Sequence, residues 1–284
     1  MTAPSPPSPV PAPESTIAFI GGGNMARSLI GGLIARGTDP ATIRVAEPVA
    51  ELRQALAGQF GVQVFDAAAE AVQGAGLWLF AVKPQVMRAV CQALALAASQ
   101  DRPLVVSIAA GITTAQLTRW LGGRAAVVRA MPNTPAMLGA GVSGLFATAQ
   151  VDQAGRARTE ALLSSVGKTV WIEQEAQMDA VTAVSGSGPA YVFLLAEAME
   201  AAGIAQGLPA EAARALTLQT VLGAARMLTE SGQAPAELRR QVTSPGGTTE
   251  AAIAVFQAGG FETLTAAAIA AATARGRALS AAND

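Results

Sequence analysis

The 284-residue sequence has no histidine and only one cysteine, Cys91. Histidine is the commonest general base and metal ligand, so its absence excludes a Ser-His-Asp triad and histidine-based metal chemistry. A single cysteine excludes an internal disulfide and a cluster of thiolate ligands. We therefore expect no metal site and interpret Cys91 as a small apolar residue of a helix. Because few cysteines suit a reducing compartment, we also expect a cytoplasmic protein.

Long apolar runs and an excess of charge of one sign are also lacking. The densest apolar stretch, Ala75 to Val82, is far shorter than the ~20 residues of a membrane span. Basic residues number 19 and acidic residues 20, so no basic face indicates a nucleic acid or an anionic membrane. We expect a small-molecule substrate and no nucleic-acid or membrane partner.

A glycine-rich turn near the amino terminus is the segment around which the chain is organised. Ile17 to Ile20 is a short apolar run typical of a buried parallel strand, and apolar residues recur at helical spacing from Met25 onward. Between them lies the pattern Gly21-x-Gly23-x-x-Ala26. A dinucleotide pyrophosphate must approach the backbone at a helix start, where a Cβ would obstruct it. The pattern favours a cofactor-binding turn over a purely structural one.

Apolar runs and helical segments alternate after this turn, as in a doubly wound α/β sheet with right-handed crossovers. The predicted strands are 17–20, 43–46, 62–65, 77–82, 104–109, 125–129, 142–147 and 168–172, and helices are predicted at 50–58, 67–73, 85–98, 113–121 and 152–165. We expect a Rossmann-like dinucleotide-binding domain over 15–176. Residues 1–14 are rich in proline and lack the features of a signal peptide, so we expect a disordered leader there.

Strand signals vanish from Met178 onward, and alanine-rich helical patterns continue to the end. These helices carry few charges, as in the run from Tyr191 to Ala196, which indicates that they bury more than one face. A small helical domain does this most easily by packing against another subunit. The sequence therefore predicts a second, all-helical domain over 177–284 that forms a homodimer.

Two segments that follow predicted strands are candidates for contact with a ligand. Lys83-Pro84 lies where doubly wound folds bind ligands, and lysine is scarce, since the chain has only Lys83 and Lys168. The alternative is a solvated lysine at a strand end. Met131-Pro132-Asn133-Thr134-Pro135 is stiffened by two prolines, so it either walls the nicotinamide pocket or is an ordinary rigid turn.

The loop from Val242 to Thr249 precedes a predicted helix that begins near Glu250. Free amides and hydroxyls at such a helix start can bind a carboxylate. The alternative is a helix capped by Thr248 or Thr249, which needs no ligand. Two glycines beside several hydroxyl residues exceed what capping requires, so the pattern favours a binding loop.

Glu47 follows the second predicted strand, where such folds contact the adenosine ribose. An acidic side chain there bonds the 2′-hydroxyl of NADH and repels the 2′-phosphate of NADPH. Arg44 and Arg53 are near enough in sequence to offset that repulsion. The alternative is a solvated glutamate at a strand end, so the choice between NADP and NAD stays open.

Taken together, these segments resemble the pyrroline-5-carboxylate reductase family from about residue 16 to the C-terminus. The matching motifs are Ile20-Gly21-Gly22-Gly23-Asn24-Met25-Ala26, Ala81-Val82-Lys83-Pro84-Gln85, Ser107-Ile108-Ala109-Ala110-Gly111, Met131 to Pro135, Ser185-Gly186-Ser187-Gly188-Pro189-Ala190-Tyr191 and Val242 to Thr249. The last two are far more specific than the glycine turn. The resemblance implies an N-terminal NAD(P)H domain and a helical domain that dimerises, with the active site at the subunit interface. Family analogy also allows a ring of several dimers.

The resemblance further implies which residues bind each ligand. For the cofactor, NADP or NAD in reduced form, they are Ile20, Gly21, Gly22, Gly23, Asn24, Met25, Ala81, Val82, Lys83, Pro84, Ile108, Ala109 and Ala110, and the ribose position adds Glu47. For the substrate they are Glu175, Gly246, Gly247, Thr248 and Thr249, of which Glu175 rests on resemblance alone. The hydroxyls of Thr249 and Ser244 are the candidate catalytic groups.

The implied reaction is hydride transfer from NAD(P)H to the C=N carbon of 1-pyrroline-5-carboxylate, which gives L-proline in the last step of proline biosynthesis. The cofactor supplies the hydride and a protonated imine is already electrophilic, so the missing histidine is no objection. Two alternatives stay open. A β-hydroxyacid dehydrogenase has a similar domain arrangement but uses a lysine of the helical part, and no lysine follows Lys168. The other is a non-catalytic dinucleotide-binding sensor.

Overall fold

The computed structural model describes residues 16–283, and the expected leader over 1–14 lies outside them. Its strands are β1 (Ile17–Ile20), β2 (Ile43–Ala46), β3 (Gln63–Phe65), β4 (Leu77–Phe80), β5 (Leu104–Ser107), β6 (Ala126–Met131), β7 (Gly141–Ala147) and β8 (Gly167–Trp171). Every predicted strand is present, with ends that differ by at most two residues. The apolar runs therefore predicted the sheet well.

The α-helices are α1 (Asn24–Ala35), α2 (Ala50–Phe60), α3 (Ala68–Ala71), α4 (Pro84–Asp101), α5 (Thr114–Trp120), α6 (Gln153–Leu163), α7 (Met178–Val181), α8 (Gly188–Ala205), α9 (Ala210–Glu230), α10 (Pro235–Gln241), α11 (Thr248–Ala258) and α12 (Phe261–Ala282). Shorter turns are η1 (Pro40–Thr42), η2 (Thr134–Leu138), η3 (Ser164–Val166), η4 (Glu175–Gln177) and the π-helical η5 (Thr182–Gly186). Capping residues and proline explain where several of these helices begin. Asp152 caps α6, Thr113 and Gln116 form a capping box on α5, and Pro84 is the first residue of α4.

The strands form one eight-stranded sheet in the order β3-β2-β1-β4-β5-β6-β7-β8. All neighbours are parallel except β6 and β7, which pair antiparallel. The chain moves outward from β1 to β3 on one side and from β4 to β6 on the other. The direction of winding therefore reverses between β1 and β4, and ligands of doubly wound sheets bind at such a switch point.

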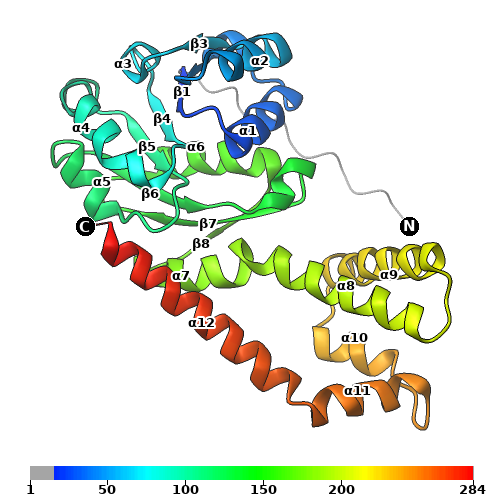
Figure 1. Cartoon of the computed structure of the whole chain (residues 1–284). Coiled ribbons are helices and arrows are strands. Elements are labelled where there is room, and N and C mark those ends of the chain that lie inside the picture. Colours follow the sequence, from blue (N-terminus) through cyan, green and yellow to red (C-terminus); the bar gives the residue numbers. More distant parts are fainter. Residues whose placement is uncertain (1–15, 284) are drawn as a thin grey trace. The chain divides into compact units, whose positions relative to one another are not determined.

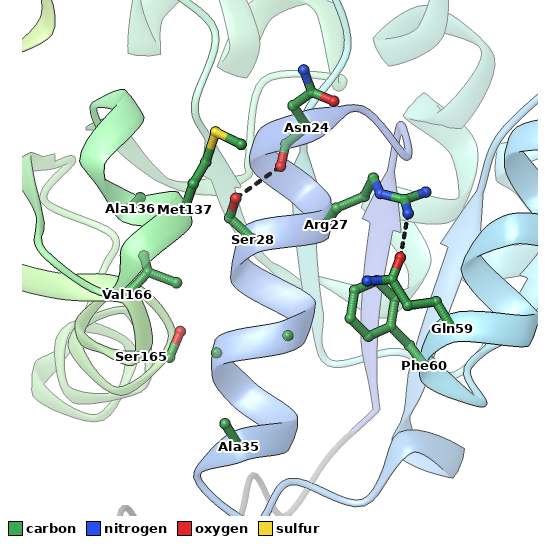
Figure 2. Close-up of a pocket in the computed structure, with 13 residues that line it drawn as sticks. Asn24, Arg27, Ser28, Ala35, Gln59, Phe60, Ala136, Met137, Ser165 and Val166 are labelled. Carbon is green, nitrogen blue, oxygen red and sulfur yellow. Dashed lines mark hydrogen bonds between the residues drawn. The ribbon is translucent and has the colours of Figure 1, made fainter. Parts of the chain in front are cut away.

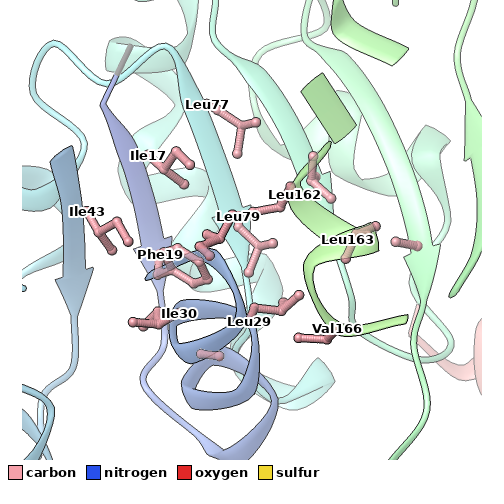
Figure 3. Close-up of a cluster of buried hydrophobic side chains, with 14 of the residues drawn as sticks. Ile17, Phe19, Leu29, Ile30, Ile43, Leu77, Leu79, Leu162, Leu163 and Val166 are labelled. Carbon is pink, nitrogen blue, oxygen red and sulfur yellow. The ribbon is translucent and has the colours of Figure 1, made fainter. Parts of the chain in front are cut away.

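Apolar side chains alternate between the two faces of the sheet, and helices cover both faces (Figure 1). Ile17 and Phe19 of β1 pack with Leu29 of α1 and Leu162 of α6 in one cluster, shown in Figure 3. Ala18 and Ile20 of β1 belong to a second cluster on the opposite face, with side chains of α4 and α5. This three-layer packing confirms the expected doubly wound architecture.

Cys91 lies in the second cluster, on α4, and its side chain is fully buried. Burial raises the pKa of the Cys91 thiol to about 12, because the charged thiolate would lose its hydration. The thiol therefore stays protonated and unreactive at neutral pH. This confirms the interpretation of Cys91 as an apolar helix residue.

The chain divides into two compact units. One runs to Gly186 and also takes in the chain from Ala272 onward, and the other is Ser187–Ala271. The expected division after residue 176 differs, because α7 packs directly on the sheet. A Cβ placed on Gly144 of β7 would lie 2.4 Å from a methyl carbon of Val181, so only glycine allows this approach.

The second unit consists of α8 to α11 and the first part of α12, and many of its apolar side chains face outward. None of the residues of α8 or α11 is buried, and Phe193 and Leu194 of α8 are each 66% exposed. Among residues 16–283, no single helix is long and apolar enough to span a membrane. The helices α11 and α12, which are bent by 52° at the break between them, are long and apolar enough only when they are taken together.

Candidate functional site

Four connections predicted to bind the cofactor lie at one edge of the sheet. They follow β2, β1, β4 and β5, which are neighbours and parallel, so their carboxyl ends meet there. Backbone hydrogen bonds extend the strand pairing into these connections. The N–H of Gly21 donates to the carbonyl of Ala46 (2.9 Å), that of Ala81 to Ile20 (2.8 Å), and that of Ile108 to Phe80 (3.1 Å). The segments around these residues are thereby held side by side.

The three glycines of the β1–α1 turn have different surroundings. Gly21 has φ of +104°, and a Cβ there would lie 2.8 Å from the carbonyl oxygen of Ala81. A Cβ on Gly22 would lie 2.5 Å from a methyl carbon of Leu56. Gly23 has φ of −68°, and no atom lies within 4 Å of a Cβ built on it. Internal packing therefore explains Gly21 and Gly22, whereas Gly23 borders open space.

Gly23 is also the N-cap of α1, and no side chain caps that helix. The first N–H groups of a helix have no partner within the helix and carry partial positive charge. Gly23 and Asn24 are exposed, whereas Met25 is half-buried. The turn therefore presents backbone donors to solvent where a side chain at Gly23 would intrude, which is the geometry that an anionic pyrophosphate requires.

Glu47 is buried at the end of β2, so the alternative of a solvated glutamate is wrong. Its two carboxylate oxygens accept hydrogen bonds from the N–H groups of Gly22 and Val49, each at 3.0 Å. Those bonds compensate for the loss of hydration of the carboxylate. Since a carboxylate has about four acceptor sites, capacity remains for a further donor.

The two arginines near Glu47 lie at different ends of the sheet. Arg53 donates to the backbone carbonyls of Glu47 (2.7 Å) and Pro48 (2.8 Å), at the carboxyl edge. Arg44 instead donates to the carbonyl of Gln73, in the connection that leads into β4 and hence at the amino edge. Only Arg53 is therefore placed near the end of β2.

The other predicted cofactor residues follow β4 and β5. Lys83 is exposed and is the N-cap of α4, and Ala81, Val82 and Pro84 are half-buried. After β5, Ile108 is half-buried, Ala109 is buried, and Ala110 is exposed. A lysine at this edge has the reach to meet a phosphate or a ribose hydroxyl.

The loop after β6 is held by Asn133, which is buried. Its amide nitrogen donates to the carbonyl of Ser185 in η5 (3.0 Å), and its amide oxygen accepts from the N–H of Val142 (2.9 Å). Asn133 thus joins the start of β7 to the π-helical turn, a contact that sequence spacing could not reveal. Both predicted interpretations of this loop, a pocket wall and a rigid turn, remain compatible with that geometry.

The predicted substrate loop lies in the second unit and forms a tight turn before α11. Pro245 and Gly246 are its central residues, Gly246 has φ of +70°, and the N–H of Gly247 donates to the carbonyl of Ser244 (3.0 Å). This combination is the signature of a type II turn. The N–H of Gly246 donates to the carboxylate of Glu250 (2.7 Å). The amides of both glycines are thus used within the loop.

Thr248 and Thr249 are the first residues of α11, and the N-cap is Gly247 with no side-chain cap. The alternative in which one of these threonines caps the helix is therefore wrong. Within residues 16–283, neither their N–H groups nor their hydroxyls have a hydrogen-bond partner. Of the predicted carboxylate-binding groups, these donors are the ones that remain available.

Glu175, predicted from resemblance alone, lies in η4 in the first unit. One carboxylate oxygen accepts from the N–H of Thr114 (2.7 Å) and from Arg129 (3.2 Å), and the other accepts from the hydroxyl of Thr114 (2.6 Å). The carboxylate thereby caps α5 and pairs with a buried guanidinium. Nothing in the sequence indicated this cluster, because its members are 46 and 61 residues from Glu175.

A cavity of about 500 Å³ lies along α1 and is shown in Figure 2. Its lining includes Arg27, Phe60 and Met137, and it shares only Asn24 with the predicted cofactor residues. The Arg27 side chain lies over the Phe60 ring and donates to Gln59. This cavity is therefore distinct from the edge of the sheet described above.

The mainly parallel sheet, with the glycine turn at its switch point, has the architecture of a dinucleotide-binding domain. Together with the family matches given next, it defines a nicotinamide-dependent oxidoreductase. Two family models match the chain. One, described as pyrroline-5-carboxylate reductase dimerisation, covers residues 175–279. The other, described as NADP oxidoreductase coenzyme F420-dependent, covers residues 16–111.

Individual proteins are similar over nearly the whole chain. A pyrroline-5-carboxylate reductase from Pseudomonas aeruginosa is 58% identical over 259 residues, which cover 91% of this chain and 94% of the relative. The solved enzyme from Coxiella burnetii has a TM-score of 0.91 and 43% identity, covering 94% and 99% of the two chains. The Plasmodium falciparum enzyme, solved with NADP bound, has a TM-score of 0.83 and 26% identity, covering 95% and 99%. The chain belongs to the pyrroline-5-carboxylate reductase family.

The contrast between Gly21 and Gly23 makes a testable prediction. The methyl group added by Gly23→Ala meets no atom of the protein, so the melting temperature of this variant should stay near that of the wild type. Its affinity for NAD(P)H should fall at least tenfold, or about 1.4 kcal/mol. Gly21→Ala should instead lower the melting temperature, because φ is positive and Ala81 blocks the new Cβ. Thermal melts and fluorescence titration with NADPH measure both effects. Unchanged nucleotide affinity in Gly23→Ala would contradict the assignment of the turn.

Proposed function

We propose that this chain reduces 1-pyrroline-5-carboxylate to L-proline with a nicotinamide nucleotide bound across the carboxyl ends of β2, β1, β4 and β5. The reaction is the last step of proline biosynthesis. The observation that carries the proposal is the open space at Gly23, at the uncapped start of α1, in a chain 58% identical to a curated pyrroline-5-carboxylate reductase. A steady-state assay with pyrroline-5-carboxylate and each of NADH and NADPH tests it directly.

The proposed cofactor site uses backbone more than side chains. The N–H groups at the start of α1 would bind the pyrophosphate, Glu47 and Arg53 would lie beside the adenosine ribose, and Lys83 would contact a phosphate or a ribose hydroxyl. Ile108 to Ala110, at the end of the neighbouring strand, would contact the nicotinamide half. The bound nucleotide supplies a hydride for the C=N carbon of the substrate.

The proposed substrate site is the start of α11. The N–H groups of Thr248 and Thr249 would bind the substrate carboxylate, and the Thr249 hydroxyl would contact the ring nitrogen. Because a protonated imine is already electrophilic, these residues need only orient the ring, and no histidine is required. Glu175, whose oxygens already accept bonds from Thr114 and Arg129, and Ser244 stay predictions as substrate and catalytic groups.

Thr249 provides the sharpest test of this site. Thr249→Ala removes one hydrogen bond to a charged ligand, typically worth ~1.5–3 kcal/mol, so kcat/KM should fall roughly ten- to a hundredfold. NAD(P)H affinity without substrate should stay unchanged. Thr249→Ser should keep most activity, because it keeps the hydroxyl.

Thr265→Ala is a matched control, since the Thr265 hydroxyl donates to the carbonyl of Phe261 within α12. Its kcat/KM should stay near that of the wild type. Near-normal kcat/KM in Thr249→Ala would require another substrate site. The wild type could instead bind NAD(P)H tightly but fail to oxidise it with any cyclic imine. That result would favour a dinucleotide sensor.

Nucleotide choice depends on the two side chains proposed to lie beside the ribose. Glu47→Gln removes the charge and keeps the shape and one of the two acceptor oxygens, so the ratio of kcat/KM for NADPH to that for NADH should rise about tenfold. Arg53→Ala should lower that ratio. Arg44→Ala is the control, because Arg44 bonds Gln73 at the opposite edge of the sheet. Equal ratios in all three variants and the wild type would exclude both roles.

We further propose that the second unit joins two copies of the chain into a homodimer. Its support is the exposed apolar surface of α8 and the match to a family model described as dimerisation. Light scattering should show twice the chain mass, or an even multiple if dimers form a ring. A cytoplasmic location, expected from the single cysteine, stays a prediction.

Leu194→Glu should reduce the mass to that of one chain, because Leu194 is 66% exposed on α8. Leu96→Glu places the same charge on α4, at a leucine that is 72% exposed in the first unit. That variant should keep the wild-type mass. A wild type with the mass of one chain at micromolar concentration would contradict the proposal.

A further inference from the structure

The last turns of α12 belong to the first compact unit and lie beside α5 (Figure 1). Two hydrogen bonds attach them there. The side-chain amide of Gln116 donates to the carbonyl of Ser280 (3.3 Å), and that of Asn283 donates to the carbonyl of Gly111 (3.1 Å). The end of the described chain is therefore anchored to the connection between β5 and α5.

The backbone conformation of Gly111 allows this contact. Its φ is +71°, and a Cβ there would lie 3.4 Å from both the Asn283 amide nitrogen and the Cβ of Leu279. The turn thus packs directly against the end of α12. Gly111 also follows immediately after Ile108 to Ala110, the segment proposed to contact the cofactor. An anchor at Gly111 therefore restrains the carboxyl end of that segment, while the Ile108 N–H bond to Phe80 restrains its start.

Asn283 is itself held in the orientation that donates to Gly111. Its amide nitrogen also donates to the carbonyl of Leu279 (2.9 Å), one turn earlier in α12. The other anchor is equally constrained, since Gln116 is buried and its side-chain oxygen accepts from the N–H of Thr113 (2.8 Å). The turn at Gly111 and the first part of α5 are thus both hydrogen-bonded to the end of α12.

We propose that Asn283 is a positioning residue for the cofactor: through Gly111 it fixes the turn formed by Ile108, Ala109 and Ala110. This inference rests on the proposed contact of that turn with the nicotinamide nucleotide. Asn283 touches neither the substrate nor the reacting atoms. It makes the C-terminal end of the chain part of the support of the nucleotide site.

Asn283→Asp tests the inference with almost no change in size. A carboxylate cannot donate to the Gly111 carbonyl, and its charge is unfavourable at the negative end of α12. The NADPH dissociation constant without substrate, and the KM for NADPH, should each rise about two- to tenfold, as expected for one hydrogen bond. The KM for pyrroline-5-carboxylate should stay unchanged. Asn283→Gln keeps the amide donor and should recover most of the affinity.

Arg277→Ala, at an exposed residue near the same end of α12, controls for general disturbance of the helix. Hydrogen exchange of residues 108–111 without nucleotide gives a second readout, which should speed up in Asn283→Asp and not in Arg277→Ala. Unchanged exchange would show that Asn283 does not hold the turn. Equal loss of affinity in the aspartate and glutamine variants would indicate a merely structural role.

The same measurements separate this inference from the proposed function. Faster exchange with an unchanged NADPH dissociation constant would overturn the inference and show that the turn does not contact the nucleotide. Failure of the wild type to bind either NADPH or NADH would overturn the proposed function instead. Binding of NADPH that weakens in both Gly23→Ala and Asn283→Asp would support both.

Discussion

The crossing of the β1–α1 turn over the end of β4 is the contact on which the proposed nucleotide site depends. A Cβ at Gly21 would lie 2.8 Å from the Ala81 carbonyl oxygen, so the two backbones touch at the switch point of the sheet. The helix α1 begins at Asn24, directly after this turn. In the same turn the N–H of Gly22 donates to the Glu47 carboxylate at the end of β2, at 3.0 Å. The turn thus joins the ends of three neighbouring strands.

Two carboxylates of the first unit, those of Glu47 and Glu175, hold backbone turns in place. Glu47 accepts from two backbone N–H groups, and Glu175 caps α5 while it pairs with the buried guanidinium of Arg129. Such groups are costly to bury unless they are paired, so each restricts its turn to one arrangement. This use of charge suits an enzyme in which the cofactor supplies the reactive group and the protein supplies orientation.

The order and type of the strands could be predicted because parallel buried strands are continuous apolar runs, such as Leu77 to Phe80. The glycine turn and Glu47 could be placed at one edge because carboxyl ends of parallel strands share an edge. The partners of Glu175 could not be predicted, since Thr114 and Arg129 are far from it in sequence. The same holds for the contact of Asn133 with Ser185.

The sequence by itself determined the fold class, the switch point, the absence of histidine chemistry and the family, because these depend on local patterns and on composition. Only the tertiary structure decided that Gly23 borders open space while Gly22 is packed, and that Thr249 does not cap α11. It alone brought Asn283 to Gly111, across 172 residues of chain. Each of these depends on which atoms of distant segments meet, and spacing along the chain does not specify that.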